Sequence, residues 1–158
     1  MRSMRAIALA VFARLAVITT AQVNDAAIRQ QVLASGTKDS LFVFGHWTKE
    51  GGTETRLALL GEVTTPKGRR FKVLNSTWIW GYSKRATNRI LIFSGRDEYL
   101  GNYYVSMIDD LPNRIESGHL VFINKLDDHC HVAKELVDLE RGLPRRFFVS
   151  CRGEFVFE

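Results

Sequence analysis

The stretch RRFKVLNSTWIWG, residues 69–81, decides the fold together with the two stretches that follow it, YSKRATNRILIFSG (82–95) and RDEYLGNYYV (96–105). Each stretch is rich in β-branched and aromatic residues, and glycines end or interrupt the runs. This composition predicts three strands. We expect these strands to form the centre of an antiparallel sheet.

The first predicted strand carries apolar side chains on both faces. One face holds Phe71, Val73 and Ile79, and the other holds Leu74, Trp78 and Trp80. This pattern is typical of a strand at the centre of a sandwich or beneath a helix. We therefore expect Trp78 and Ile79 on opposite faces and the tryptophans in the core. If aromatic groups of the stretch are exposed instead, the candidate binding surface consists of Trp78, Trp80, Tyr103 and Tyr104.

The remaining segments extend this sheet into a β-rich domain. NDAAIRQQVLASG (24–36) predicts one short helix, because Asn24 or Asp25 can cap its start and Gly36 can end it. Further strand-like runs are SLFVFGHW (40–47), ETRLALLGEVTT (54–65), HLVFIN (119–124), RRFFVSC (145–151) and GEFVFE (153–158). The short strands and their turn signals predict an antiparallel β-sandwich or barrel of about eight strands.

Cys130 and Cys151 are the only cysteines, and one disulfide between them is the simplest expectation for an exported chain. The midpoint between them falls in ERGLP (140–144), a turn-forming segment. If residues 131–139 and 145–151 pair as a hairpin about this turn, the cysteines face each other at the separation that a disulfide requires. Residues 131–139 also fit a helical face, so strand and helix remain alternatives there.

Residues 1–21 have the plan of a cleaved signal peptide: a basic start, apolar runs, and Thr19-Thr20-Ala21 as the cleavage site. This predicts an exported protein, periplasmic or secreted, with a single mature domain at residues 22–158. Arg14 interrupts the apolar region, and an arginine-bearing leader without acidic residues is also typical of a mitochondrial presequence. No other segment has the ~20 apolar residues of a transmembrane helix.

The formal net charge is low once the predicted leader is removed. Loss of Arg2, Arg5 and Arg14 lowers it from +5 to +2. A nucleic-acid-binding domain normally retains a basic stripe, so nucleic acid is not an expected partner. The remaining basic residues gather near predicted turns at 67–72, 84–89 and 141–146, where charges typically serve solubility.

Residues 127–131, Asp-Asp-His-Cys-His, form the densest polar cluster. On a strand, His129 and His131 would share one face with Asp127, an arrangement that suits zinc or copper. Without further ligands and a supporting shell it is more typical of a solvated strand end. These three residues are weak metal candidates, and we predict no cofactor. No nucleophile motif or phosphate-binding loop is recognisable, so we assign no catalytic residue.

Two short patterns have functional associations. Gly45-His46-Trp47 follows the predicted helix and resembles the G-x-W opening of lipocalins and related ligand-binding β-barrels. The resemblance covers three residues, implies a calycin-like carrier, and assigns no binding residue. Asn75-Ser76-Thr77 matches the acceptor pattern for N-glycosylation, but inside a predicted strand we interpret it as accidental.

These observations favour a small exported β-domain that binds a macromolecule, such as an inhibitor, an immunity-type protein or a module with a protein or cell-envelope partner. The alternatives are a carrier of a small apolar ligand and a hydrolase or metal-dependent enzyme whose site is assembled only on folding. A polar cleft joining His46, His119 or His131 to carboxylates would favour the enzyme.

Overall fold

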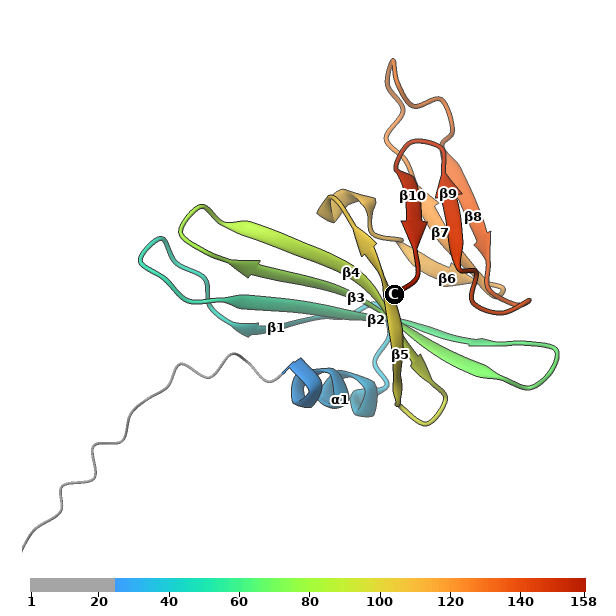
Figure 1. Ribbon diagram of the computed structural model, residues 1–158, viewed down its shortest axis with the longest axis horizontal. Helices are drawn as coiled ribbons and strands as arrows, with labels where there is room; N and C mark the ends of the chain where they lie inside the picture. The colour runs from blue at the N-terminus through green and yellow to red at the C-terminus, as the bar shows by residue number, and fades with distance from the viewer. Residues whose placement is uncertain (1–24) are drawn as a thin grey trace, which may run out of the picture.

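The computed structural model describes residues 25–158, and the predicted signal peptide lies outside these residues. The described part of the chain forms one α-helix, ten strands and one 3-10 turn. All paired strands are antiparallel, as expected for the predicted fold class. Figure 1 shows the helix below a large sheet and the C-terminal strands above one end of it.

Helix α1 (Asp25–Ser35) occupies the segment predicted to be helical. Its apolar residues Ile28, Val32 and Leu33 are buried against the sheet. Gly36 follows with a φ of 63° and donates its backbone N–H to the carbonyl of Leu33 at 3.2 Å. This left-handed conformation ends the helix at the predicted residue.

The large sheet is a five-stranded meander in which every strand pairs with the next along the chain. Its strands are β1 (Leu41–Gly45), β2 (Glu54–Thr64), β3 (Arg70–Trp80), β4 (Arg85–Ser94) and β5 (Tyr99–Val105). The three strands predicted within residues 69–105 are β3, β4 and β5. Strand β3 lies at the centre of the sheet, as its two apolar faces indicated.

Both faces of the sheet are covered. Helix α1 packs on one face, where Val32 contacts a cluster that includes Leu74 of β3. The opposite face packs on the second layer of strands through a larger cluster that includes Val73 of the same strand. Trp78 and Ile79 point to opposite faces, as predicted; Ile79 is buried, whereas Trp78 is half-buried.

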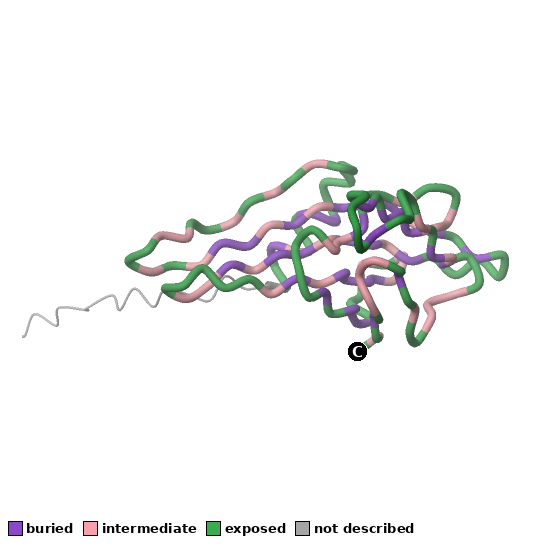
Figure 2. The backbone as a smooth tube through the Cα atoms, turned by 90° about the horizontal axis from the view of Figure 1, so that it is seen from above, coloured by how far each residue is buried: buried purple, intermediate pink, exposed green. Residues whose placement is uncertain are grey.

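The second layer contains a three-stranded sheet and a hairpin. The sheet is formed by β6 (Arg114–Glu116), β7 (His119–Ile123) and β8 (Lys134–Asp138), and the hairpin by β9 (Arg146–Val149) and β10 (Gly153–Val156). Aromatic rings fill the space between the layers: Phe147 stacks on Phe155 at 4.8 Å and meets Tyr103 edge-on at 5.0 Å between ring centroids. Figure 2 shows the buried residues along the inner strands and the exposed ones at the hairpin ends.

The hairpin expected between residues 131–139 and 145–151 is wrong. Strand β8 pairs with β7, and β9 pairs with β10. The connection between β9 and β10, residues 150–152, is shorter than the connection between β8 and β9, residues 139–145, so pairing β9 with β10 costs less loop-closure entropy. Strand β6 was also not predicted.

The disulfide is present although the hairpin is not. Cys130 and Cys151 are bonded, with their Cα atoms 5.4 Å apart. Each lies in a turn beside a strand rather than in a strand. Residues 134–138 are a strand, which confirms the strand interpretation of this segment over the helical one.

Candidate functional site

Strand β1 is an unprotected edge of the five-stranded sheet (Figure 1). It pairs with β2 on one side, and no strand of residues 25–158 pairs with its outer side. Its sequence LFVFG has neither charge nor proline, and Leu41 and Val43 are 62% and 52% exposed. Natural edge strands usually carry charges, prolines or bulges that prevent pairing with other chains. Strand β1 has no such residue, which makes it a candidate docking edge.

The opposite edge of the sheet is covered by the end of the chain itself. The backbone N–H of Asn102 in β5 donates to the carbonyl of Glu158 at 3.0 Å, and the N–H of Glu158 donates back to the carbonyl of Asn102 at 2.9 Å. Tyr103 and Phe157 form a bridge beside them. The two edges of the sheet therefore differ: one has a partner from its own chain, and the other has none among the described residues.

An open groove of about 600 Å³ adjoins β1. Its floor comes from β2 and β3, and its walls come from the 3-10 turn with the loop after it and from the end of β7 with the segment that follows. The lining residues are Leu41, Arg56, Ala58, Asn75, Thr77, Ile108, Asp109, Leu111, Pro112, Asn113, Ile123, Lys125 and Arg152. Leu41 belongs to both features, so the groove opens beside the β1 edge.

The groove floor holds a buried polar atom without a partner. The Asn75 side-chain amide donates from Nδ2 to the carbonyl of Pro112 at 2.7 Å, which fixes its orientation. Its Oδ1 atom is buried and accepts no hydrogen bond from the described residues. An unpaired buried acceptor destabilises a fold by roughly 1–3 kcal/mol.

Charges at the groove are unevenly compensated. Arg56 donates from Nε to Glu54 Oε1 at 2.6 Å, and this hydrogen bond is the main reason why the pKa of the Glu54 carboxyl lies below its ordinary value. Lys125 on the far wall has no ion-pair partner among residues 25–158. Among residues 25–158, Asp109 is the only acidic residue that lines the groove. This lining favours a partner segment with acidic residues.

Arg152 holds the groove wall together. Its Nη1 donates to the carbonyls of Asp109 and Leu111 at 2.7 and 3.1 Å, and its Nη2 donates to the carbonyl of Ile123 at 2.6 Å. Its Nε donates to Asn124 Oδ1 at 2.8 Å. These bonds join the loop before β6 to the end of β7. We therefore assign Arg152 to the framework of the groove rather than to ligand recognition.

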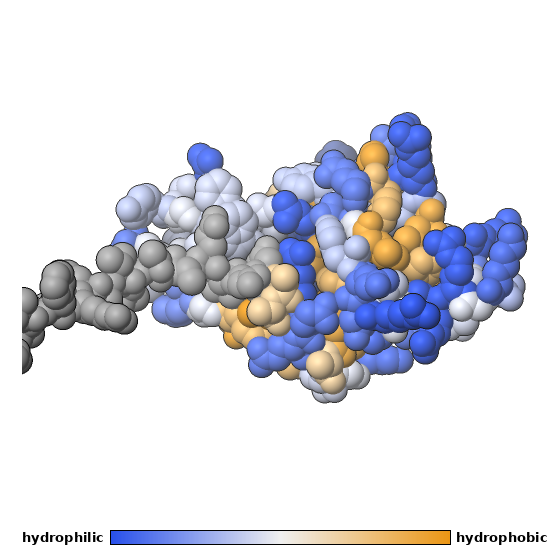
Figure 3. Space-filling view, turned by 60° about the horizontal axis from the view of Figure 1, so that its bottom comes forward, coloured by the Kyte–Doolittle hydropathy of each residue, from blue (hydrophilic) through white to orange (hydrophobic). Residues whose placement is uncertain are grey.

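Exposed apolar side chains line the groove at Leu41, Ile108 and Ile123, and Met107 and Leu126, each next in sequence to a lining residue, are also exposed. Apolar groups are exposed elsewhere as well. Figure 3 shows hydrophobic groups among hydrophilic ones on the side seen from below, and Leu136 and Phe148 of the second layer are also exposed. The groove differs from these surfaces in its edge strand: β1 carries no charged residue, whereas the edge strands β8 and β9, which hold Leu136 and Phe148, do.

The four aromatic residues predicted as a possible binding surface are separated by the structure. Trp78 and Trp80 are half-buried and stack at 5.5 Å between centroids, and Tyr104 on the same side of the sheet is exposed. Tyr103 is 0% exposed, and its hydroxyl donates to the carbonyl of Pro144 at 2.6 Å. Tyr103 is a core residue and belongs to no surface.

The weak metal candidates lie in a turn rather than on a strand. Asp127 Oδ1 accepts hydrogen bonds from the backbone N–H groups of His129 and Cys130 at 2.8 and 3.0 Å. Its carboxylate therefore caps the turn that positions Cys130 for the disulfide. Among residues 25–158, no group of three or more His, Cys, Asp or Glu side chains is placed to hold a metal ion.

No protein-family model, no curated protein and no solved structure matches the chain. In the described residues no helix has the length and apolar character needed to cross a bilayer. The functional conclusion therefore depends on the geometry of the edge strand and its groove.

Proposed function

We propose that the protein is an exported β-domain that binds an extended segment of a partner protein by strand addition at β1. The observation that carries this proposal is the exposed edge of β1, which has neither charge nor proline and lies beside an open groove. Strand addition supplies affinity through main-chain hydrogen bonds and specificity through pockets for alternate side chains.

An extended peptide matches the chemistry of this surface. The outer edge of a strand presents alternating N–H and C=O groups, and only another strand pairs with the whole row. Side chains of an added strand would alternate between the two faces of the sheet. Those on the face of Leu41 and Val43 would lie beside the opening of the groove.

Export is supported by the predicted leader together with the disulfide between Cys130 and Cys151. Disulfides persist in oxidising compartments and are rare in the cytosol. A stable disulfide also suits a module that acts outside the cell or in the periplasm.

A carrier of small apolar ligands fits the interior less well. The aromatic rings that a carrier would use to line a cavity, such as Tyr103, Phe147 and Phe155, contact one another between the two layers. A ligand at this position would have to displace close-packed rings. The open surface beside β1 needs no such rearrangement.

Selection of peptides from a random display library on the purified protein tests the proposal. Backbone NMR shifts on peptide addition should centre on Leu41–Gly45 and the groove lining. The double variant Leu41→Lys/Val43→Lys places charges on the edge and should abolish binding. The control Leu136→Lys/Phe148→Lys adds the same charges to an exposed apolar surface of the second layer and should leave binding intact.

Two outcomes would contradict the proposal: selected peptides that bind the control surface, or binding that is insensitive to charges at Leu41 and Val43. A dimer that dissociates in the Leu41→Lys/Val43→Lys variant would show instead that a second copy of the chain pairs with β1. Sedimentation velocity of both proteins distinguishes this outcome from peptide binding.

A further inference from the structure

A second depression lies at the far end of β3, between the β2–β3 turn and the β4–β5 turn. Its volume is about 430 Å³, and its lining includes three arginines, Arg69, Arg70 and Arg96. The remaining lining residues are Gly68, Phe71, Ser94, Gly95, Glu98 and Leu100. Strand β1 pairs with the other end of β2, so this depression is separate from the proposed peptide edge.

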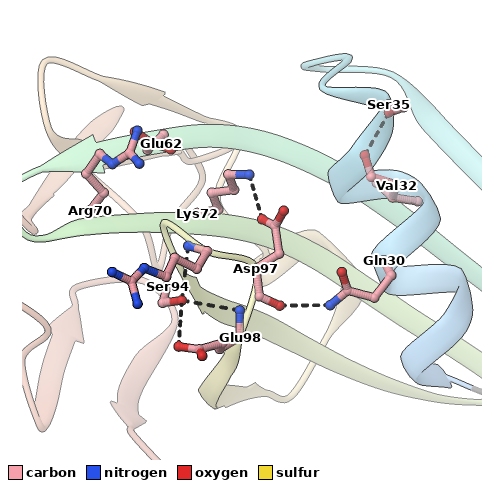
Figure 4. Close-up of polar contacts among 10 residues, drawn as sticks. Gln30, Val32, Ser35, Glu62, Arg70, Lys72, Ser94, Asp97 and Glu98 are labelled. Carbon is pink, nitrogen blue, oxygen red and sulfur yellow. Dashed lines mark hydrogen bonds and ion pairs between the residues drawn. The ribbon is translucent and has the colours of Figure 1, made fainter.

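Positive charge in this depression is poorly compensated. Figure 4 shows Lys72 of the neighbouring sheet surface in contact with Asp97, an ion pair of 2.5 Å that neutralises both. Arg70 forms a long ion pair with Glu62, with Nη1 3.6 Å from Oε1. Arg96 forms no ion pair within residues 25–158. Glu98, the one carboxylate that lines the depression in the described part of the chain, accepts a hydrogen bond from Ser94 Oγ at 3.3 Å.

All three arginines are exposed, and two of them also contact neighbouring groups. The guanidinium of Arg69 lies over the ring of Phe71, with Cζ 5.1 Å from its centroid. Arg70 crosses the β4–β5 turn at Gly95, where an added Cβ would lie 2.9 Å from Arg70 Cβ and 3.0 Å from its Nε. Glycine at position 95 therefore permits the observed path of the Arg70 side chain.

We propose that this depression binds a tetrahedral oxyanion, the phosphate or sulfate group of a larger ligand. Guanidinium groups form forked, charge-assisted hydrogen bonds that match such oxyanions. The formal charge after loss of the three leader arginines is only +2, yet three arginines meet here. A general surplus of basic residues does not account for this concentration.

A neighbouring depression of about 330 Å³ is also lined by Arg69. Its other charged lining residues are the basic Lys67 and Arg141 and the acidic Glu140. A ligand with more than one anionic group would contact both depressions. We therefore expect tripolyphosphate to bind more tightly than inorganic phosphate.

Titration of the 15N-labelled protein with inorganic phosphate, sulfate and tripolyphosphate tests the site. The Nε–Hε signals of Arg69, Arg70 and Arg96 should shift, together with the amides of the β4–β5 turn. Arg69→Ala and Arg96→Ala should each weaken tripolyphosphate binding about tenfold, the effect of losing one charge-assisted hydrogen bond.

Two further variants distinguish a built site from diffuse attraction. Gly95→Ala keeps every charge but displaces Arg70, so it should weaken binding several-fold. Arg85→Ala removes the same charge at the opposite end of β4 and should change affinity less than twofold. Equal effects of Arg85→Ala and Arg96→Ala, or no effect of Gly95→Ala, would overturn the proposal, as would absence of binding to all three anions.

The source of the oxyanion follows from a parallel assay. Co-sedimentation with phosphatidylglycerol vesicles that is lost in Arg96→Ala, but not in Arg85→Ala, would identify a lipid headgroup. Binding of tripolyphosphate without binding to vesicles would identify a soluble phosphorylated ligand. Thermal unfolding of each variant verifies that it is folded.

Discussion

Cys130 and Cys151 are covalently joined, although the strands beside them, β8 and β9, do not pair with each other. The bond connects the turn before β8 to the turn after β9. Next to it, Glu135 of β8 accepts hydrogen bonds from the backbone N–H and the hydroxyl of Ser150, the nearest at 2.7 Å. The disulfide and this carboxylate together fasten the β9–β10 hairpin to the three-stranded sheet.

Replacement of both cysteines by serine should lower the free energy of unfolding by about 3 kcal/mol, because the bond closes a loop with a sequence separation of 21. Urea unfolding of the double variant measures the loss, and binding of selected peptides should persist because β1 lies elsewhere. Mass spectrometry of unreduced protein tests the bond itself. Two alkylatable thiols in protein purified from an oxidising compartment would contradict it.

The cysteine pairing could be predicted from the sequence, but the geometry that produces it could not. Two cysteines in an exported chain allow one intramolecular pair, whatever the strand order. The hairpin model also placed them face to face, but through a pairing of residues 131–139 with 145–151 that does not form. Strand β8 pairs with β7, and β9 pairs with β10. The sequences of β7 and β10 are as typical of strands as those of β8 and β9, so periodicity does not indicate which strands pair.

The central sheet was accessible to prediction because its signals are long and consistent. Strand β3 spans eleven residues and carries apolar side chains on both faces, and turns with glycine bound it. Strand β6 has three residues and no periodicity of its own, so only its pairing with β7 defines it. The candidate site depends on what the sequence cannot show: which strand lies at the edge and which edge the C-terminus covers.

Trp78→Ala should lower the free energy of unfolding by about 1–2 kcal/mol, less than the roughly 3–5 kcal/mol typical of a fully buried aromatic residue. Trp78 is half-buried and stacks on Trp80, so part of its ring already faces solvent. Equilibrium urea unfolding gives the change, and near-ultraviolet circular dichroism reports the lost ring pair. A cost as large as that of a core tryptophan would show that the ring is covered in solution.

Gly101→Ala should detach the end of the chain from β5. Gly101 has a φ of 148°, and a Cβ added there would lie 2.3 Å from the carbonyl oxygen of Glu158 and 2.6 Å from the Phe157 ring. We expect faster hydrogen exchange at the amides of Asn102 and Glu158. Deletion of residues 157 and 158 is the matched control, since it should produce the same exchange pattern at Asn102. Unchanged protection in both variants would contradict this role of the C-terminus.

Tyr103 should make the fold sensitive to alkali. Burial raises the pKa of its phenol above the ordinary value of 10.0, so the folded state keeps a proton that the unfolded state releases. Its stabilising effect is complete below pH 10 and decreases as the pH rises further. In the Tyr103→Phe variant, the free energy of unfolding should decrease less steeply as the pH rises above 10. Near neutrality the variant should be less stable by about 1–2 kcal/mol, because the hydrogen bond to the Pro144 carbonyl is lost. Urea midpoints between pH 8 and 11 compare the two proteins.

Glu135 should make the fold sensitive to acid, in the opposite direction. Burial disfavours its carboxylate, but hydrogen bonds from the backbone and hydroxyl of Ser150 and from Asn124 outweigh this, so its pKa lies below the ordinary value of 4.5. Between the folded-state pKa and pH 4.5, the Glu135 carboxyl is therefore mostly ionised in the folded protein but mostly protonated in the unfolded chain. The stabilisation is complete above pH 4.5 and is lost as the pH falls through the lower, folded-state pKa.

Glu135→Gln keeps the shape of the side chain and one acceptor oxygen for Ser150 but removes the charge. The variant should be less stable than the natural protein at pH 7, and the difference should shrink as the pH falls below 4.5. Urea midpoints at several pH values between 7 and 3 measure this convergence. Parallel curves over the whole range would show that the carboxylate does not hold the β9–β10 hairpin through its charge. The disulfide and the hydrogen bonds from Arg152 to Ile123 and Asn124 would then link the two parts of the second layer.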